Sequence, residues 1–96
     1  MSINIQSSSD LQRKLAAKAK ARRLAENLSR RTLANKSGVS QASIKRFETS
    51  GEVSLSNLLN IAFALNCTKE FDVLFDPKAP DSIAELQASP RQRGSQ

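Results

Sequence analysis

The chain has 96 residues, of which 39% are hydrophobic and 25% charged, a size and balance typical of one small globular domain. It contains no His and a single cysteine, Cys67, so neither a Ser–His or Cys–His catalytic pair nor a structural zinc site can be assembled from it. Because the sequence also has no glycine-rich phosphate-binding loop, we expect a protein that is not an enzyme and that uses no metal or cofactor.

The sequence also bears on location. No apolar run approaches the roughly 20 residues that a transmembrane helix needs. Residues 1–6 lack the basic start and apolar stretch of a signal peptide. A lone free thiol suits a reducing compartment. We therefore expect a cytoplasmic protein that does not bind membranes.

Charge is distributed unevenly along the chain. Residues 1–47 contain 11 basic and two acidic residues, a net charge of +9, whereas residues 48–96 contain four basic and seven acidic residues, a net charge of −3. Basic side chains can serve simply as a solvated helix surface, but a ratio of 11 to two favours a face that binds a polyanion. The acidic half would then supply a scaffold or a surface for a protein partner.

The first predicted element is a helix over about residues 11–27, preceded by a flexible lead over residues 1–9. The polar run at residues 7–10 offers good helix caps. The helix itself has no Pro or Gly and is rich in strong helix formers. Its thin, alanine-rich apolar stripe predicts close packing against neighbouring helices and a frayed start. The stripe consists of Leu15, Ala19, Ala21, Leu24, Ala25 and Leu28.

Two short helices follow, each with a serine cap and a glycine stop. Ser29 caps a helix of about eight residues that ends at Gly38, because glycine adopts the left-handed conformation at a helix end most cheaply. Ser40 caps a third helix over about residues 41–49, which ends at Gly51. The residues predicted to face inward are Leu33, Ala34, Ile44 and Phe47.

The fourth helix, capped by Ser54, is predicted to supply the largest part of the core, because its apolar residues follow the i, i+3, i+4, i+7 rule. These residues are Leu55, Leu58, Leu59, Ala62 and Leu65, with Ile61 and Phe63 widening the stripe. A fifth short helix is expected over residues 68–75, a weak helical turn over residues 81–88 and disorder over residues 89–96. No alternation typical of strands is present, so the predicted fold class is all-α.

The most informative stretch lies within residues 29–51. Two short helices are joined by the turn Ser37-Gly38-Val39-Ser40, with a small residue at Ala34 and apolar anchors at Val39 and Ile44. This is the helix-turn-helix pattern. Its helices cross closely and need a small residue, its turn needs a positive φ, and its second helix shows a polar face to the major groove of DNA.

On these residues the chain resembles the Xre/Cro family of phage-repressor-type DNA-binding domains, over about residues 15–75. The resemblance is carried by Leu28, Ser29, Leu33, Ala34, residues 37–40, Ser43, Ile44, Phe47, Glu48 and the leucine-rich fourth helix up to Leu65. It implies a five-helix phage-repressor-like domain over residues 10–76, followed by a largely disordered tail over residues 77–96. It also implies a transcriptional regulator that binds a palindromic operator in double-stranded DNA. Arg30 departs from the pattern, since the family most often has Gln at this position.

The resemblance further implies site residues. Base contacts fall to Gln41, Ala42 and Arg46, whose side chains suit adenine, the thymine methyl group and guanine. Contacts to the DNA backbone or to flanking bases fall to Arg30, Arg31, Ser40, Ser43, Lys45 and Lys20, and these would fix the position of the protein on the duplex. The alternative for Gln41 and Lys45 is a plain solvated helix face.

Two groups of residues are expected to act within or between protein chains. Arg23 and Glu48 match family positions that form an ion pair between the first and third helices, so we assign them a structural role. Apolar residues late in the chain exceed what a small helical core needs, which favours a homodimer surface over extra core beneath the tail. The expected dimer residues are Phe63, Phe71, Val73, Leu74 and Phe75.

A narrower resemblance rests on residues 43–48, 51–55 and 71–75. These runs are similar to HipB-type regulators, which by resemblance repress their own operon and neutralise a HipA-like kinase toxin. The acidic half would serve as the surface for that partner. Three alternatives remain: a stand-alone repressor, a module that mainly neutralises a protein partner, and a membrane-binding first helix, which its alanine-rich face without aromatic residues disfavours.

Overall fold

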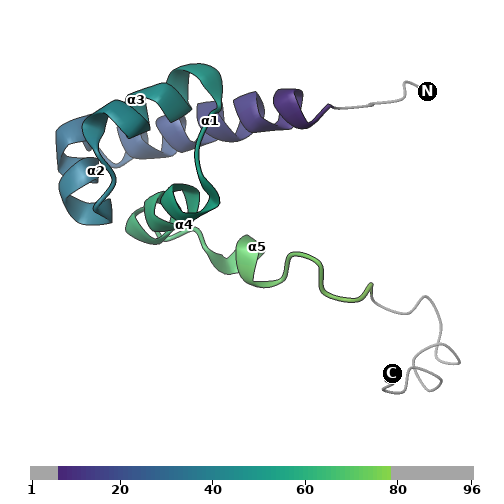
Figure 1. Cartoon of the computed structure of the whole chain (residues 1–96). Coiled ribbons are helices and arrows are strands. Elements are labelled where there is room, and N and C mark those ends of the chain that lie inside the picture. Colours follow the sequence, from purple (N-terminus) through teal and green to yellow (C-terminus); the bar gives the residue numbers. More distant parts are fainter. Residues whose placement is uncertain (1–6, 79–96) are drawn as a thin grey trace, which may run out of the picture.

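The computed structural model describes residues 7–78, and within this range it contains five helices and no strand (Figure 1). The helices are α1 (Ser8–Ala25), α2 (Arg30–Ser37), α3 (Gln41–Ser50), α4 (Leu55–Ala64) and α5 (Lys69–Asp72). Helix α3 packs on α1 and on α2, and α2 also packs on α4. The predicted all-α fold class is therefore confirmed. The helical turn and the disorder predicted after residue 80 lie outside the described residues.

The core lies where α1 to α4 meet. Its largest fully buried side chains are Leu33 of α2, Ile44 and Phe47 of α3, and Leu65 at the end of α4. Fully burying one such side chain contributes about 1.5–3 kcal/mol. Two of these side chains belong to α3, so the inner face of this helix is firmly fixed, as its pattern predicted.

Helix α1 differs from the prediction at its start and in its buried face. The Ser7 side chain accepts a hydrogen bond from the Asp10 backbone, and the Asp10 side chain accepts one from the Ser7 backbone. This capping box begins the helix at Ser8, three residues before the predicted start at about residue 11 and within the predicted lead over residues 1–9.

The buried face of α1 is centred on Ala16 and Arg23 rather than on the predicted stripe. Leu15, Ala19 and Leu28 pack beside the core, but Ala21, Leu24 and Ala25 are exposed. The physical reason is that an ion pair holds Arg23 inward. Since successive residues lie about 100° apart around a helix, the residues on either side of Arg23 turn toward solvent.

The glycines that end α2 and α3 both have a positive φ but differ in their surroundings. Gly38 has φ +77°, and a Cβ atom added there would meet nothing within 4 Å. Gly51 has φ +85°, and a Cβ atom there would lie 3.0 Å from the backbone carbon of Gln12. Gly38 therefore serves the turn alone, whereas Gly51 also allows α3 to end directly against α1.

Helices α4 and α5 place fewer apolar residues in the core than predicted. Leu55, the first residue of α4, is 68% exposed, while Ile61, Ala62 and Leu65 are buried. The buried face of α4 is thus centred on Ile61, Ala62 and Leu65. Leu55, which the predicted stripe included, lies outside the core.

Helix α5 is a single turn, shorter than the predicted range of residues 68–75. Val73 ends it, and Phe75 has φ +71°, a left-handed conformation that a helix cannot contain. The chain is also constrained here by Pro77, which disfavours helical geometry at the residue before it. The apolar residues after α5 therefore remain outside the core.

Candidate nucleic-acid interface

Helix α3 separates a buried apolar face from an exposed polar face. Ser40 caps the helix by accepting a hydrogen bond of 3.1 Å from the Ser43 backbone. Ile44 and Phe47 are buried, whereas Gln41, Ala42, Lys45 and Arg46 are exposed. The structure therefore brings all three predicted base-contacting residues to the outer side of one helix. This arrangement suits a helix that enters the major groove.

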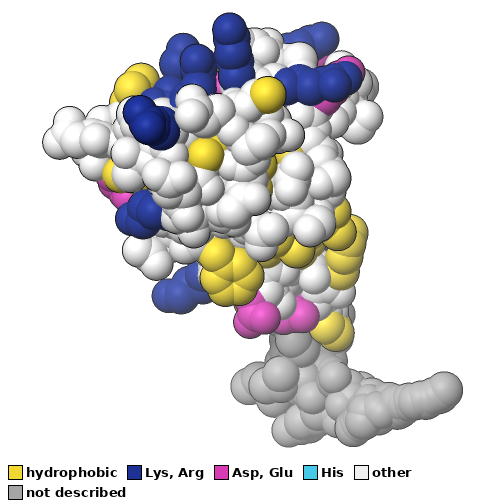
Figure 2. Space-filling model, turned by 60° about the vertical axis from the view of Figure 1, so that its left-hand side comes forward, with side chains coloured by type: hydrophobic (Ala, Val, Ile, Leu, Met, Phe, Trp, Pro, Cys, Tyr) yellow, Lys and Arg dark blue, Asp and Glu magenta, His cyan; other side chains and the backbone are white. Residues whose placement is uncertain are grey.

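Positive charge gathers over the same part of the molecule. Figure 2 shows Lys and Arg side chains mainly over the upper region, where Figure 1 places α1 to α3. The largest hydrophobic side chains in this view lie below it, and acidic side chains appear both among the basic ones and at the lower end. Within residues 7–78, Arg31, Lys36 and Lys45 have no acidic oxygen within 4 Å, and the same holds for Lys20 on α1. These exposed side chains are available to phosphate oxygens.

Ser40 and Ser43, both predicted to contact the DNA backbone or flanking bases, hydrogen-bond to each other. The Ser40 hydroxyl donates to the Ser43 hydroxyl at 2.9 Å while also accepting from the Ser43 backbone. The Ser43 side chain is half-buried and lines a shallow hollow between α3 and α4. In this conformation both hydroxyls support the start of α3.

The predicted ion pair between α1 and α3 is present in the structure. Arg23 Nε donates to Glu48 Oε2 at 2.7 Å and Nη2 donates to Oε1 at 3.0 Å, while Nη1 donates to the Leu28 carbonyl oxygen at 2.8 Å. The Glu48 side chain is only 2% exposed. A bidentate contact of this kind is strong and fixes the orientation of both groups. The pair joins the α1–α2 turn to the second half of α3.

A second arginine shares this carboxylate. Arg30 Nε donates to Glu48 Oε1 at 2.9 Å, so this residue of α2, predicted to contact the DNA backbone, also pairs with a residue of α3. Burial would raise the pKa of Glu48, but the hydrogen bonds from Arg23 and Arg30 outweigh it and hold that pKa below its ordinary value. The departure of Arg30 from the family pattern was the signal that could have revealed this second bond.

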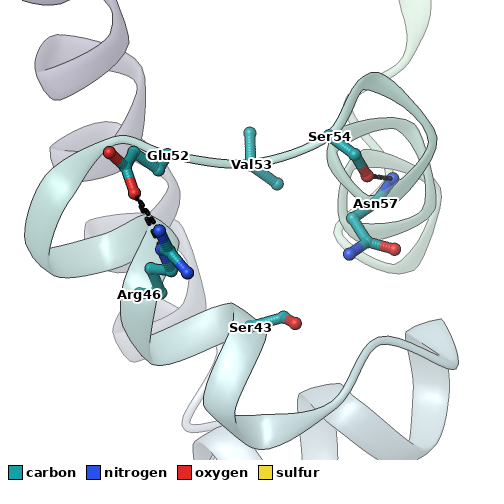
Figure 3. Close-up of a pocket in the computed structure, with 6 residues that line it drawn as sticks. All are labelled: Ser43, Arg46, Glu52, Val53, Ser54 and Asn57. Atoms are coloured by element: carbon teal, nitrogen blue, oxygen red, sulfur yellow. Dashed lines mark hydrogen bonds and ion pairs between the residues drawn. The ribbon is translucent and has the colours of Figure 1, made fainter.

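Arg46 also has an acidic partner, which the sequence pattern did not reveal. Its Nε donates to Glu52 Oε1 at 2.8 Å, and its Nη2 lies 2.6 Å from the same oxygen. Figure 3 shows the two side chains meeting beside the hollow of about 300 Å³ that lies between the end of α3 and the start of α4. The six-residue separation is not a helical spacing, and the turn at Gly51 is what brings them together.

The predicted dimer residues are mainly exposed. Phe63 is 68% exposed and Phe75 is 95% exposed, and about half of Val73 and Leu74 is exposed. Phe71 is half-buried, and it and Leu74 line an apolar groove of about 560 Å³ between α1, α4 and α5. The structure thus leaves most of these residues exposed, on α4 and in the segment after it, rather than in the core. Figure 1 shows that this segment runs away from α1 to α3.

No group of three or more His, Cys, Asp or Glu residues within residues 7–78 could hold a metal ion. None of the helices there is both long and apolar enough to cross a bilayer.

A comparison with models of protein families agrees with this geometry. A comparison with curated proteins finds no match. A family model described as helix-turn-helix, of the Xre/Cro type, matches residues 20–71, which includes the end of α1 and all of α2, α3 and α4. The match spans more than half of the chain and includes the exposed face of α3. The chain therefore belongs to the Xre/Cro-type helix-turn-helix family of DNA-binding transcriptional regulators.

Proposed function

We propose that this protein is a sequence-specific repressor that binds a palindromic operator as a homodimer and acts as the antitoxin of a HipA-like kinase. The observation that carries its DNA-binding part is the exposed face of α3, where Gln41, Ala42 and Arg46 stand beside one another above a fully buried inner face. A rigidly packed helix with a polar outer face is what direct reading of bases in the major groove requires.

The residues divide between reading bases and holding the backbone. Gln41 forms two hydrogen bonds with adenine, Ala42 contacts a thymine methyl group, and Arg46 grips guanine O6 and N7. Arg31, Lys45 and Lys20 bind phosphates, because they are exposed and have no acidic partner within residues 7–78. Ser40 and Ser43 remain proposed backbone contacts. Arg30 remains one too, because its contact with Glu48 uses Nε and leaves Nη1 and Nη2 to donate to a phosphate.

The proposed dimer uses the apolar pole of the molecule. Phe63, Phe71, Val73, Leu74 and Phe75 form this surface, and large apolar patches on small proteins commonly mark an interface. Because a helix-turn-helix dimer contacts half-sites about 34–36 Å apart, two α3 helices must be held at that spacing by a contact elsewhere. These residues lie outside α3, so a contact through them leaves the exposed face of α3 open to DNA.

The antitoxin role rests on different features. Glu70, Asp72 and Asp76 surround the exposed apolar residues after α4, so this pole combines negative charge with apolar surface. A kinase partner with a basic, partly apolar surface would suit it. A kinase-like reading frame beside this gene and its recovery with this protein from the native host would support the role. Recovery of the protein without a partner favours a stand-alone repressor.

The DNA-binding function is tested by selecting bound sequences from a random duplex library at two salt concentrations. We expect an enriched palindrome and a steep loss of affinity as salt rises, because phosphate contacts release counterions. Arg46→Ala should weaken the free energy of binding to the enriched site by about 1–3 kcal/mol. It should also relax the base preference at one position of each half-site. Weak binding to every duplex without enrichment would contradict the proposal and direct attention to a protein partner.

A further inference from the structure

The backbone around Glu52 is fixed to the last turn of α3 and to α1. The Ser50 hydroxyl donates to the Arg46 carbonyl oxygen at 2.7 Å and accepts from the Glu52 backbone at 3.1 Å. The Gly51 carbonyl oxygen accepts a hydrogen bond of 3.3 Å from Gln12 Nε2. Gly51 also lies directly against α1. The backbone of Glu52 therefore has a defined position, from which its side chain reaches Arg46.

The contact leaves one edge of the Arg46 guanidinium free. Glu52 Oε1 engages Nε and Nη2, which form the side edge of the planar group. The end edge, with one N–H of Nη1 and one of Nη2, still offers two parallel donors. Two parallel donors are what guanine O6 and N7 accept in the major groove.

Stability does not explain this ion pair. The Arg46 and Glu52 side chains are 71% and 60% exposed, and exposed pairs contribute little to folding. The pair does change which DNA groups Arg46 can approach. A carboxylate beside the guanidinium repels phosphate oxygens, whereas guanine presents neutral acceptors and suffers no such repulsion.

We propose that Glu52 is a positioning residue for DNA readout, which turns the end edge of Arg46 toward a guanine and keeps Arg46 off the phosphate backbone. This inference rests on the proposed function, in which Arg46 reads a base. Glu52 thereby raises the contribution of Arg46 to operator binding and lowers the contribution of Arg46 to non-specific DNA binding. Lys45, also exposed on α3, has no such acidic partner within residues 7–78 and keeps the backbone role.

The test compares the wild-type protein with Glu52→Gln on three duplexes: the operator selected by the wild-type protein, the same operator with the Arg46-dependent guanine replaced, and an unrelated sequence. We expect Glu52→Gln to reduce the preference for that guanine about tenfold, within the range of one bidentate base contact. We also expect its affinity for the unrelated duplex to rise. In an Arg46→Ala background, Glu52→Gln should leave base preference at that position unchanged.

The matched control is Glu26→Gln, which changes the net charge equally and also removes the acid of an exposed arginine pair, Arg22–Glu26. It should keep the wild-type guanine preference. An unchanged guanine preference in Glu52→Gln would overturn the inference, whether or not affinity rises for all duplexes alike. An equal loss in the Arg46→Ala background would overturn it too. If the wild-type protein itself enriches no sequence, the proposed function fails first and this inference fails with it.

Discussion

At the residue scale, one buried carboxylate organises the helix-turn-helix. Glu48 accepts hydrogen bonds from Arg23 of α1 and Arg30 of α2, while its own backbone belongs to α3. Three helices therefore meet at a single charged group. Since two arginines surround one carboxylate, loss of that carboxylate would leave buried positive charge without compensation. We expect the orientation of α3 relative to α1 to depend on this network.

The network makes stability depend on pH in a defined direction. The pKa of Glu48 is lower in the folded protein than in the unfolded chain, so its stabilising contribution is present above the unfolded value, near 4.3 for a free Glu. That contribution is lost as the pH falls through the folded pKa. Glu48→Gln should lower the free energy of unfolding at neutral pH by about 3–5 kcal/mol. It should also make the free energy of unfolding depend less on pH at acidic pH, as measured by denaturant titrations at a series of pH values.

The control for this prediction is Glu26→Gln, which removes an exposed carboxylate that pairs with Arg22 alone. It should change the free energy of unfolding by less than about 1 kcal/mol. If the free energy of unfolding of Glu48→Gln still fell at acidic pH as steeply as that of the wild-type protein, other carboxylates would have to account for the decrease.

At the element scale, the local signals of the helix-turn-helix were sufficient to predict it. Serine caps and glycine stops gave α2 its bounds, and the apolar spacing gave α3 its buried face. The errors arose where tertiary contacts outweigh local pattern. A buried ion pair set the inward face of α1, and the packing of α4 left Leu55 outside the core. The place of Arg46 on the outer side of α3 was predicted from its position in the helix. Its contact with Glu52 was not, because that contact depends on the geometry of the turn at Gly51, which the sequence pattern does not specify.

The two helix-ending glycines allow a comparison of backbone strain with steric contact. Gly38→Ala should lower the free energy of unfolding by about 1–2 kcal/mol, because a left-handed φ is unfavourable for any residue with a Cβ atom. Gly51→Ala should cost more, since its Cβ atom would also lie 3.0 Å from the Gln12 backbone and force α1 away. Urea unfolding of both variants measures the difference. Equal losses would show that α1 moves aside at no cost.

At the scale of the whole molecule, charge and apolar surface lie at different poles. The basic residues concentrate over α1 to α3, whereas most of the large exposed apolar residues lie on α4 and after α5, with Leu11 and Leu24 of α1 as exceptions (Figure 2). The proposed DNA contact and the proposed protein contact would therefore use different surfaces. For a repressor that is also an antitoxin, this separation would allow one molecule to hold operator and toxin together.

The proposed dimer gives the prediction that belongs to this scale. Replacing Phe63 and Phe75 together by Ser should raise the dimer dissociation constant by about 30-fold or more, as loss of a central aromatic contact typically does. Affinity for a two-half-site operator should fall, while affinity for a single half-site should not. Leu24→Ser is the control, because Leu24 is also a large exposed apolar residue, 54% exposed, but lies on α1. Sedimentation equilibrium measures the constant, and greater dissociation of Leu24→Ser than of the double variant would place the dimer contact on α1 instead.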